Sequence, residues 1–324
     1  MAVRPTFVFG SPRSGTTWLA RIFDSRPDTL YRHEPDICNP GELPYVFGPD
    51  ELEPHVETMQ AYAKTLVEDR SLRSNGLLPQ FAKSYRSALA QKFRLSLLYA
   101  GRALEKATPG LQLDRKLKIP DLIAAGSTAH PVIKSVSSMG RLPLLARSVE
   151  DCNIVVLVRH PCGVVASGLR GVATGKMSTA QAYHDWLKLE PAIRRGLTAQ
   201  KLDQLSHVEV LATSWLLFNE YVLDALAGNP RVKVVVYEEL CENPVELTQE
   251  IFDHCGFDDS PETRDFIRAC LDSTDASPEY FQVLRNPKAA AVRWKSELSE
   301  ADQQTVYELT RDSTPGRLFY TDAG

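Results

Sequence analysis

The sequence predicts an α/β fold: a three-layer sandwich in which helices flank a central, mostly parallel sheet. Aliphatic runs without polar alternation recur along the chain, which is typical of strands buried on both faces. Each long run is followed by apolar residues at helical spacing, so strands and helices alternate. The 324 residues contain no internal repeat and no convincing linker, and we therefore expect a single domain over residues 1–324.

The first strand is predicted over residues 6–9 (TFVF), where Gly10 ends a short apolar run. A turn rich in Gly, Ser and Pro follows it. Four apolar residues then repeat at helical spacing until Pro27: Trp18, Leu19, Ile22 and Phe23. This segment therefore predicts a strand, a loop and a helix.

Between residues 49 and 129 the strand signals vanish, and we expect a helical insertion. Apolar residues recur there at every fourth position, as on one slowly drifting helix face: Phe81, Tyr85, Leu89, Phe93 and Leu97. Residues 70–106 hold eight basic residues and one acid, Glu105. A solvated helix face is the favoured interpretation of this charge run, and an anion-binding surface is the alternative.

Three further strands are predicted after the insertion. A weak one begins at residues 131–133, and residues 153–158 (NIVVLV) form a near-continuous aliphatic run. Pro161 and a helical apolar pattern follow that run. The last strand is predicted over residues 232–236 (VKVVV). A parallel sheet covered by helices on both faces accommodates all four predicted strands.

Composition and charge narrow the class of partner. The 37 Lys and Arg against 41 Asp and Glu give a formal net charge of −4, which does not indicate binding to nucleic acid or to an acidic membrane. No apolar run approaches the length of a membrane span, and the amino terminus lacks the pattern of a signal peptide. The six cysteines form no CxxC pair, so we expect free thiols in a cytoplasmic protein that holds no metal. A small-molecule partner is favoured.

The loop between the first strand and the first helix predicts an anion site. Residues 10–17 (GSPRSGTT) have the GxxxxG spacing of a phosphate-binding P-loop, which makes the expected fold P-loop-like. Such a loop directs successive backbone N–H groups at an anion, and the helix N-terminus adds a partial positive charge. A tight turn with incidental glycines is the less favoured interpretation.

Two cations distinguish this loop from that of a nucleoside triphosphatase. Thr16 stands where such a loop has Lys, while Arg13 supplies a guanidinium that can bind two oxygens at once. The strand over 153–158 ends in Arg159, where a metal-holding carboxylate would be expected. These substitutions indicate a ligand with a further anionic group, neutralised by protein instead of by metal.

Three segments resemble motifs of the sulfotransferases. GSPRSGTTWL resembles their 5′-phosphosulfate loop, and VVLVRHPCGVVASGL resembles their 3′-phosphate motif, with a strand-end Arg and a Ser eight positions later. VKVVVYEELCENPVELTQEIFDHCGF is similar to a later strand and helix of the family. The resemblance implies that the donor is 3′-phosphoadenosine 5′-phosphosulfate (PAPS), which accounts for both cations.

The resemblance also implies roles for individual residues. Arg159 and Ser167 match the pair that holds the 3′-phosphate, although Ser167 is alternatively a small packing residue. Trp18 and Tyr237 match positions that contact the adenosine part, with aromatic core residues as the alternative. Arg285 matches a basic loop over the 3′-phosphate. The loop residues that would bind the 5′-phosphosulfate are Ser11, Arg13, Ser14, Gly15, Thr16 and Thr17.

Sulfuryl transfer, like phosphoryl transfer, builds negative charge on the bridging oxygen of the leaving group. Cations are therefore required there, and Arg13 is the first candidate. Lys134, just after the short strand PVI, is the second, with an exposed strand-end Lys as the alternative.

The base that deprotonates the acceptor hydroxyl must lie within hydrogen-bond reach of it. Cytosolic sulfotransferases place a His shortly after the third-strand Lys, but residues 134–138 here read KSVSS. The stretch 31–35 (YRHEP) resembles the Tyr-x-x-Glu-Pro stretch of carbohydrate-type members, in which the Glu is taken as the base. Glu34 is therefore the predicted base, with His33 in reserve. Alternatively Glu34 caps a turn and His33 is a surface imidazole.

The sequence thus predicts a PAPS-dependent sulfotransferase closer to the carbohydrate-type than to the cytosolic aryl-type members. Its acceptor would be a hydroxylated carbohydrate, a lipid-linked molecule or another small molecule, and the insertion 49–129 is expected to form much of the acceptor pocket. A P-loop small-molecule kinase using ATP and magnesium is one alternative. A nucleotide-binding module without catalysis is the other, and the oligomeric state stays open.

Overall fold

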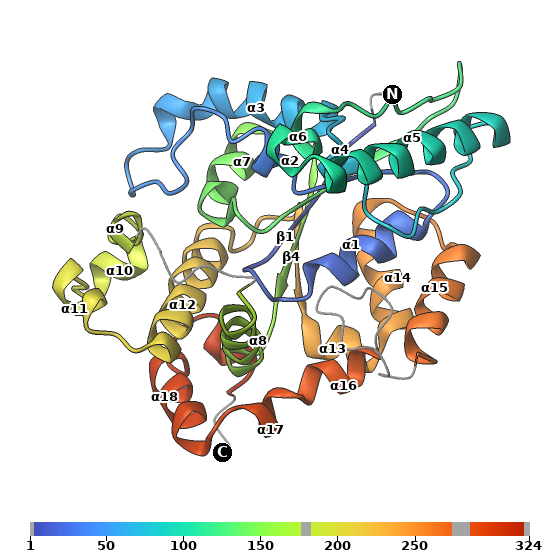
Figure 1. Ribbon diagram of the computed structural model, residues 1–324. Coiled ribbons are helices and arrows are strands. Elements are labelled where there is room, and N and C mark those ends of the chain that lie inside the picture. Colours follow the sequence, from blue (N-terminus) through green and yellow to red (C-terminus); the bar gives the residue numbers. More distant parts are fainter. Residues whose placement is uncertain (1–2, 176–182, 274–285, 321–324) are drawn as a thin grey trace.

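The computed structural model describes residues 3–175, 183–273 and 286–320, and these residues form a three-layer α/β sandwich (Figure 1). The strands of the described residues form one parallel sheet in the order β2-β3-β1-β4-β5. Their bounds are β1 Thr6–Phe9, β2 Thr29–His33, β3 His130–Ser135, β4 Asn153–Val158 and β5 Val232–Val236. The prediction of an α/β fold with a parallel sheet is confirmed.

Helices cover both faces of the sheet and form a hydrophobic core with each face. On one side lie α3 (Val56–Glu68), α7 (Leu142–Ser148) and α12 (His207–Ala225), and on the other lie α1 (Thr16–Ser25), α14 (Pro244–Cys255) and α15 (Pro261–Leu271) (Figure 1). Helix α8 (Pro161–Ala173) packs against α12 and α18 (Glu300–Thr310).

Strand β4 is aliphatic at every position after Asn153, and its packing shows why. Ile154, Val156 and Val158 belong to the core on the α12 side, while Val155 and Leu157 belong to the core on the α1 side. Because successive strand residues point to opposite faces, a strand covered on both sides needs an apolar residue at every position. Each such buried side chain contributes about 1.5–3 kcal/mol to folding relative to an exposed one.

With one exception, the remaining helices are short. The segment between β2 and β3 contains α2 (Pro35–Cys38), α3, α4 (Leu72–Asn75), α5 (Ala88–Ala107) and α6 (Leu113–Lys116). The others are α9 (Tyr183–Trp186), α10 (Glu190–Arg194), α11 (Ala199–Asp203), α13 (Tyr237–Glu242), α16 (Pro287–Val292) and α17 (Trp294–Glu297). Short 3₁₀ turns lie at Glu53–His55, Pro109–Leu111, Met139–Arg141 and Gly316–Leu318.

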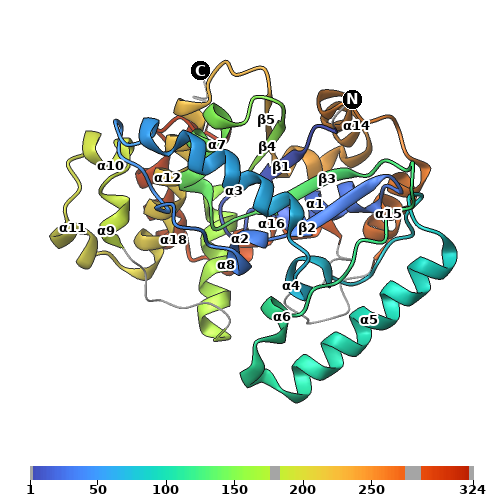
Figure 2. The same cartoon turned by 90° about the horizontal axis from the view of Figure 1, so that it is seen from above.

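Helix α5 is long but differs from the predicted helix. It begins at Ala88, after the Ser87 side chain accepts a hydrogen bond from the Ala90 N–H, so Phe81 and Tyr85 precede it. Leu89 and Phe93 are 78% and 55% exposed, and the predicted apolar face is therefore wrong. The face turned to the protein carries Arg94, Leu98 and Gly101 instead. In Figure 2, α4 and α6 lie between α5 and β2.

The basic run over residues 70–106 is only partly a solvated face, which corrects the favoured interpretation. Lys83, Arg86 and Arg94 are buried. Lys83 Nζ donates hydrogen bonds to two main-chain carbonyls and lies 3.0 Å from Asp24 Oδ1. Lys83 therefore connects the segment between β2 and β3 to the end of α1, while Arg86 and Arg94 form hydrogen bonds within that segment.

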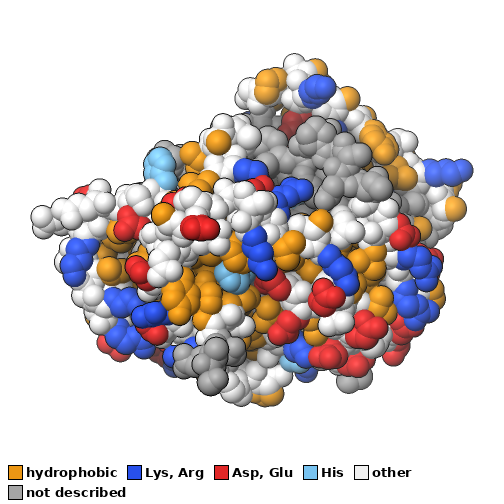
Figure 3. Space-filling model, turned by 90° about the horizontal axis from the view of Figure 1, so that it is seen from below, with side chains coloured by type: hydrophobic (Ala, Val, Ile, Leu, Met, Phe, Trp, Pro, Cys, Tyr) orange, Lys and Arg blue, Asp and Glu red, His pale blue; other side chains and the backbone are white. Residues whose placement is uncertain are grey.

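The surface charge agrees with the balanced composition. On the face seen in Figure 3, Lys and Arg side chains are interspersed with acidic and hydrophobic ones. Among the described helices, none is both long enough and apolar enough to cross a lipid bilayer.

Candidate functional site

The candidate site lies where the strand order reverses. Strand β1 is flanked by β3 and β4. At its carboxyl end, Phe9 pairs with Ser135 of β3 on one side and with Val156 of β4 on the other. In open parallel sheets the connections leave opposite faces at such a point, and a crevice forms at the carboxyl ends of the strands. The loop between β1 and α1 lies in this position.

Two glycines let this loop fold tightly. Gly15, with φ of +95°, precedes α1, and a Cβ there would lie 2.4 Å from Tyr237 Cε2. A Cβ on Gly10 would lie 2.6 Å from the Leu157 carbonyl oxygen. The Ser14 N–H donates to the Ser11 carbonyl at 3.1 Å and closes the turn between the two glycines. Both glycines of the GxxxxG spacing are therefore sterically required, because an added Cβ at either position would clash with a neighbouring atom.

Replacing Gly15 by Ala is expected to lower the free energy of unfolding by roughly 3 kcal/mol, because the new Cβ adds a clash with the buried Tyr237 ring to the strain of positive φ. The matched control is Gly228→Ala. That residue has φ of +72°, but no atom of the described residues lies within 4 Å of the added Cβ, so about 1 kcal/mol is expected. Urea denaturation of both variants measures the difference, and equal losses would show that the Tyr237 contact does not restrict the loop.

On one side of the loop, three of the predicted donor-binding residues come together. Arg13 Nε donates to Ser167 Oγ of α8 at 2.9 Å. Arg159, just after β4, donates to the Arg13 carbonyl at 3.1 Å and to the Ala290 carbonyl at 2.7 Å. Two guanidinium groups and a hydroxyl from separate elements thus meet at the loop that precedes α1.

Several polar groups of the loop are available to an anion. Ser11 Oγ and Ser14 Oγ are buried and have no hydrogen-bond partner among the described residues. Helix α1 begins at Thr16, and its N-cap residue, Gly15, has no side chain to cap the first N–H groups. Buried hydroxyls and free N–H groups at a helix N-terminus suit a phosphate or sulfate group.

Trp18 and Tyr237 lie in the hydrophobic core. Trp18 is 9% and Tyr237 5% exposed, and their rings meet edge to face at 6.2 Å. The Arg159 guanidinium lies 4.7 Å from the centre of the Tyr237 ring. Both aromatic residues are therefore core residues, which is the alternative that the sequence left open. A contact with adenosine stays a prediction. Arg285 lies outside the described residues.

On the other side of the loop, Glu34 and Lys134 form an ion pair at the carboxyl ends of β2 and β3. Lys134 Nζ donates to Glu34 Oε1, and the Glu34 N–H donates to the Lys134 carbonyl at 2.8 Å. His33 pairs with Lys134 across the two strands, and its Nε2 lies 4.0 Å from Glu34 Oε2. Lys134 is only 2% exposed, so the interpretation as an exposed strand-end Lys is wrong.

The two halves of the site influence each other electrostatically. Burial lowers the pKa of Lys134, Glu34 raises it, and the Arg13 guanidinium lowers it further. Burial would raise the pKa of Glu34, but Lys134, His33 and Arg73 together lower it to about 2. Burial and the Lys134 charge lower the pKa of His33 to about 3. At neutral pH the site therefore holds an ionised Glu34 beside a neutral His33.

Two acids that sequence reasoning did not select support these groups. Asp36 accepts hydrogen bonds from Ser135 Oγ at 2.5 Å and Ser138 Oγ at 2.7 Å, which ties the start of α2 to the loop after β3. Glu238 accepts the His160 N–H at 3.2 Å, and burial raises its pKa to about 7. The serines of KSVSS and the acids after Tyr237 can be seen in the sequence. Their partners could not be predicted, because these lie far away along the chain.

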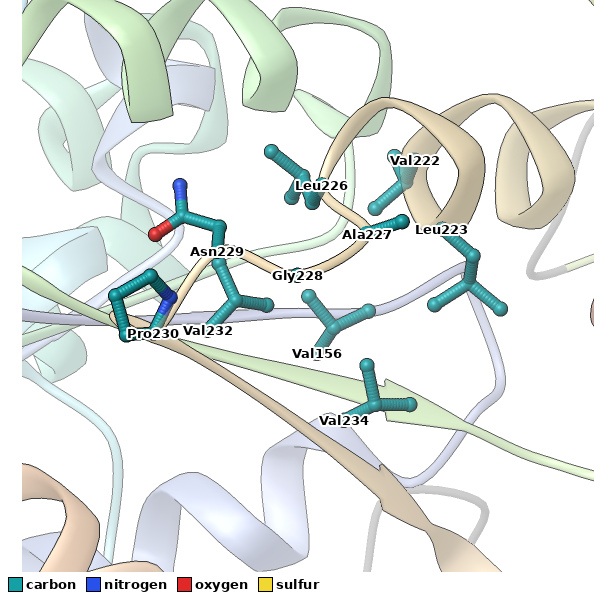
Figure 4. A pocket seen from close by; sticks show the side chains of 10 residues that line it. All are labelled: Val156, Val222, Leu223, Leu226, Ala227, Gly228, Asn229, Pro230, Val232 and Val234. Atoms are coloured by element: carbon teal, nitrogen blue, oxygen red, sulfur yellow. The ribbon is translucent and has the colours of Figure 1, made fainter.

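A separate apolar cavity of about 350 Å³ lies between the end of α12 and β5 (Figure 4). Val156, Val232, Val234 and Leu226 contribute to its lining, and Asn229 is its only polar side chain. Because the lining holds no titratable group, we do not assign the chemistry to this cavity.

A sequence model described as the sulfotransferase family matches residues 5–261. Among curated proteins, none matches the chain. Among solved structures, the chain is similar to the sulfotransferase domain of the curacin biosynthetic pathway, with 14% identity and a TM-score of 0.45 over 95% of this chain and 97% of that one. It is also similar to the sulfotransferase domain of the Synechococcus olefin synthase, with 18% identity and a TM-score of 0.45 over 95% and 94%. A mouse sulfotransferase complexed with PAP matches at 15% identity and a TM-score of 0.41 over 97% and 85%.

Proposed function

The chain belongs to the sulfotransferase family, and on that premise we propose that it transfers a sulfuryl group from PAPS to a hydroxyl group of a carbohydrate, lipid-linked or other small-molecule acceptor. One observation carries the proposal. Arg13 of the P-loop-like turn forms a cluster with Arg159 and Ser167 on one side of the site, and the buried Lys134–Glu34 pair lies on the other. The first cluster suits a nucleotide with two separate anionic groups, and the pair suits proton removal beside it.

The residues around the loop fit the donor. The buried hydroxyls of Ser11 and Ser14, together with the first N–H groups of α1, would bind the 5′-phosphosulfate. Arg159 and Ser167 would bind the 3′-phosphate, the group that distinguishes this nucleotide from AMP. The bound donor supplies the sulfuryl group and a phosphate leaving group.

Arg13 and Lys134 would stabilise the negative charge that develops between the phosphate and the sulfuryl group. Arg13 has a φ of +73° within the loop, and its Nε donates a hydrogen bond to Ser167 Oγ. Lys134 is held by Glu34 and is almost completely buried, so its charge acts at low effective dielectric. Both cations are thus held in place by contacts within the protein.

Glu34 is favoured over His33 as the base. Tyr31 OH lies 2.8 Å from His33 Nδ1, and with the tyrosine as donor the imidazole carries its proton on Nε2, the nitrogen that faces Glu34. Glu34 Oε2 makes no hydrogen bond to Lys134 and can accept the proton of the acceptor hydroxyl. A donor that draws Lys134 away from Glu34 would also raise the pKa of Glu34 toward its usual value, which strengthens the base.

Parallel label-transfer experiments test the proposal against the kinase alternative. The protein is incubated with a metabolite extract and either PAPS labelled with ³⁵S or ATP labelled with ³²P at the γ position plus magnesium. We expect ³⁵S to appear in a non-nucleotide product with release of 3′-phosphoadenosine 5′-phosphate (PAP). Transfer of ³²P without transfer of ³⁵S would contradict the proposal and favour a kinase.

A further inference from the structure

Arg73 on α4 extends toward the proposed base from the segment between β2 and β3. Its guanidinium lies 3.6 Å from Glu34 Oε2 and 3.8 Å from Asp114 Oδ2. Both distances exceed that of an N–H···O hydrogen bond. The Nε atom is buried without a hydrogen-bond partner among the described residues, while the side chain as a whole is 35% exposed. The guanidinium therefore keeps donors for a further oxygen ligand.

The buried arginines next to Arg73 differ from it. Arg32 donates to Asn75 Oδ1 at 2.6 Å and to both oxygens of Asp121 at 3.0 and 2.8 Å. Arg94 donates to Gln80 Oε1 at 2.7 Å and to Asn75 Oδ1 at 3.2 Å. Arg32 of β2 thus holds the segment against the sheet, and Arg94 links positions within the segment. A purely structural role would give Arg73 comparable bonds.

A polar groove begins beside Arg73. It has a volume of about 630 Å³, and its charged lining residues are Arg102, Lys106, Arg115, Glu105 and Asp114. Asp114 also lies 3.8 Å from Arg73, so the groove borders the Arg73–Glu34 contact. Three cations against two acids give this groove an excess of positive charge. The helices that form it, α5 and α6, lie beside α4 (Figure 2).

We infer that Arg73 binds an anionic group of the acceptor, a carboxylate, phosphate or sulfate, and that the groove between α5 and α6 takes the part of the acceptor beyond that group. This inference rests on the proposed function, because it needs the acceptor hydroxyl to lie at Glu34. A guanidinium can exchange two long ion pairs for two parallel hydrogen bonds to such an anion. The anion held there fixes the hydroxyl of the same molecule beside Glu34.

Paired probes that differ in one charge test the inference. PAP-saturated protein is titrated with p-nitrophenyl β-D-glucuronide and with p-nitrophenyl β-D-glucoside, and binding is followed by calorimetry. We expect the glucuronide to bind at least about tenfold more tightly than the glucoside, as one charged hydrogen-bonded pair would give. Arg73→Gln should abolish this preference and Arg73→Lys should retain part of it. Lys92→Gln, an exposed position of α5 outside the groove lining, should leave it unchanged.

The PAP titration distinguishes a failure of the Arg73 inference from a failure of the proposed function. If the wild-type protein and Arg73→Gln bind PAP equally but the wild type shows no preference for the glucuronide or no binding of it, the Arg73 inference is wrong and the donor site stands. A preference that survives in Arg73→Gln or disappears in Lys92→Gln would also overturn it. If the wild type does not bind PAP, the proposed function itself fails.

Discussion

The Glu34→Gln variant is expected to lose about 10³-fold in kcat while its affinity for PAP changes by less than about twofold. The amide has nearly the same shape but cannot accept the proton of the acceptor hydroxyl. It also leaves the donor-binding loop intact, because Glu34 pairs with Lys134, Arg73 and His33 and not with the loop residues. Steady-state kinetics with an acceptor identified by ³⁵S transfer, together with PAP titration, measure the two quantities.

His33→Gln is the matched control for this variant. It removes the neighbouring imidazole, whose pKa of about 3 keeps it neutral. We expect less than about a tenfold loss of kcat, because Glu34 would keep its role. A full rate in Glu34→Gln would favour a binding module or another base, and a larger loss in His33→Gln would assign the base to the imidazole.

The Arg159→Ala variant is expected to weaken PAP binding by about 100-fold, because loss of a charge-assisted, bidentate phosphate contact costs about 3 kcal/mol. AMP lacks the 3′-phosphate, so its affinity should change by less than about threefold. Calorimetric titration of both nucleotides gives the two ratios.

The AMP measurement also controls for a structural effect of this substitution. Arg159 contacts the Arg13 and Ala290 carbonyls and the face of Tyr237, so its removal can disturb the loop. An Arg159→Lys variant keeps a positive charge and should recover part of the PAP affinity. If PAP and AMP lose affinity equally, Arg159 supports the loop without recognising the 3′-phosphate.

The strands that carry the nucleotide motifs were predictable because their environment is simple. Strands β1 and β4 are covered on both faces, so after Thr6 and Asn153 at their starts every position is apolar, and these uninterrupted apolar runs identify them. Strand β2 was missed because its sequence, TLYRH, includes three polar residues, Thr29, Arg32 and His33. Arg32 is tolerated there because Asn75 and Asp121 bind its guanidinium, and those partners lie 43 and 89 residues away.

In the candidate site, too, only features that depend on residues close in the sequence were predictable. Local sequence gives the loop glycines their positions, since steric and backbone requirements act within a few residues. The pairing of Glu34 with Lys134 depends on the register of β2 on β3, where His33 lies opposite Lys134. The low pKa of Glu34 follows from that contact and was not predictable from its position before Pro35. Arg73 was one member of a basic run, and only the fold separates it from its buried neighbours.

The most direct test of the central claim is a calorimetric titration of the wild-type protein with PAP, with AMP, and with ATP in the presence and absence of magnesium. We expect tight binding of PAP without a magnesium requirement and binding of AMP at least about 100-fold weaker. Preferential binding of ATP that depends on magnesium, or equal affinity for PAP and AMP, would contradict the central claim.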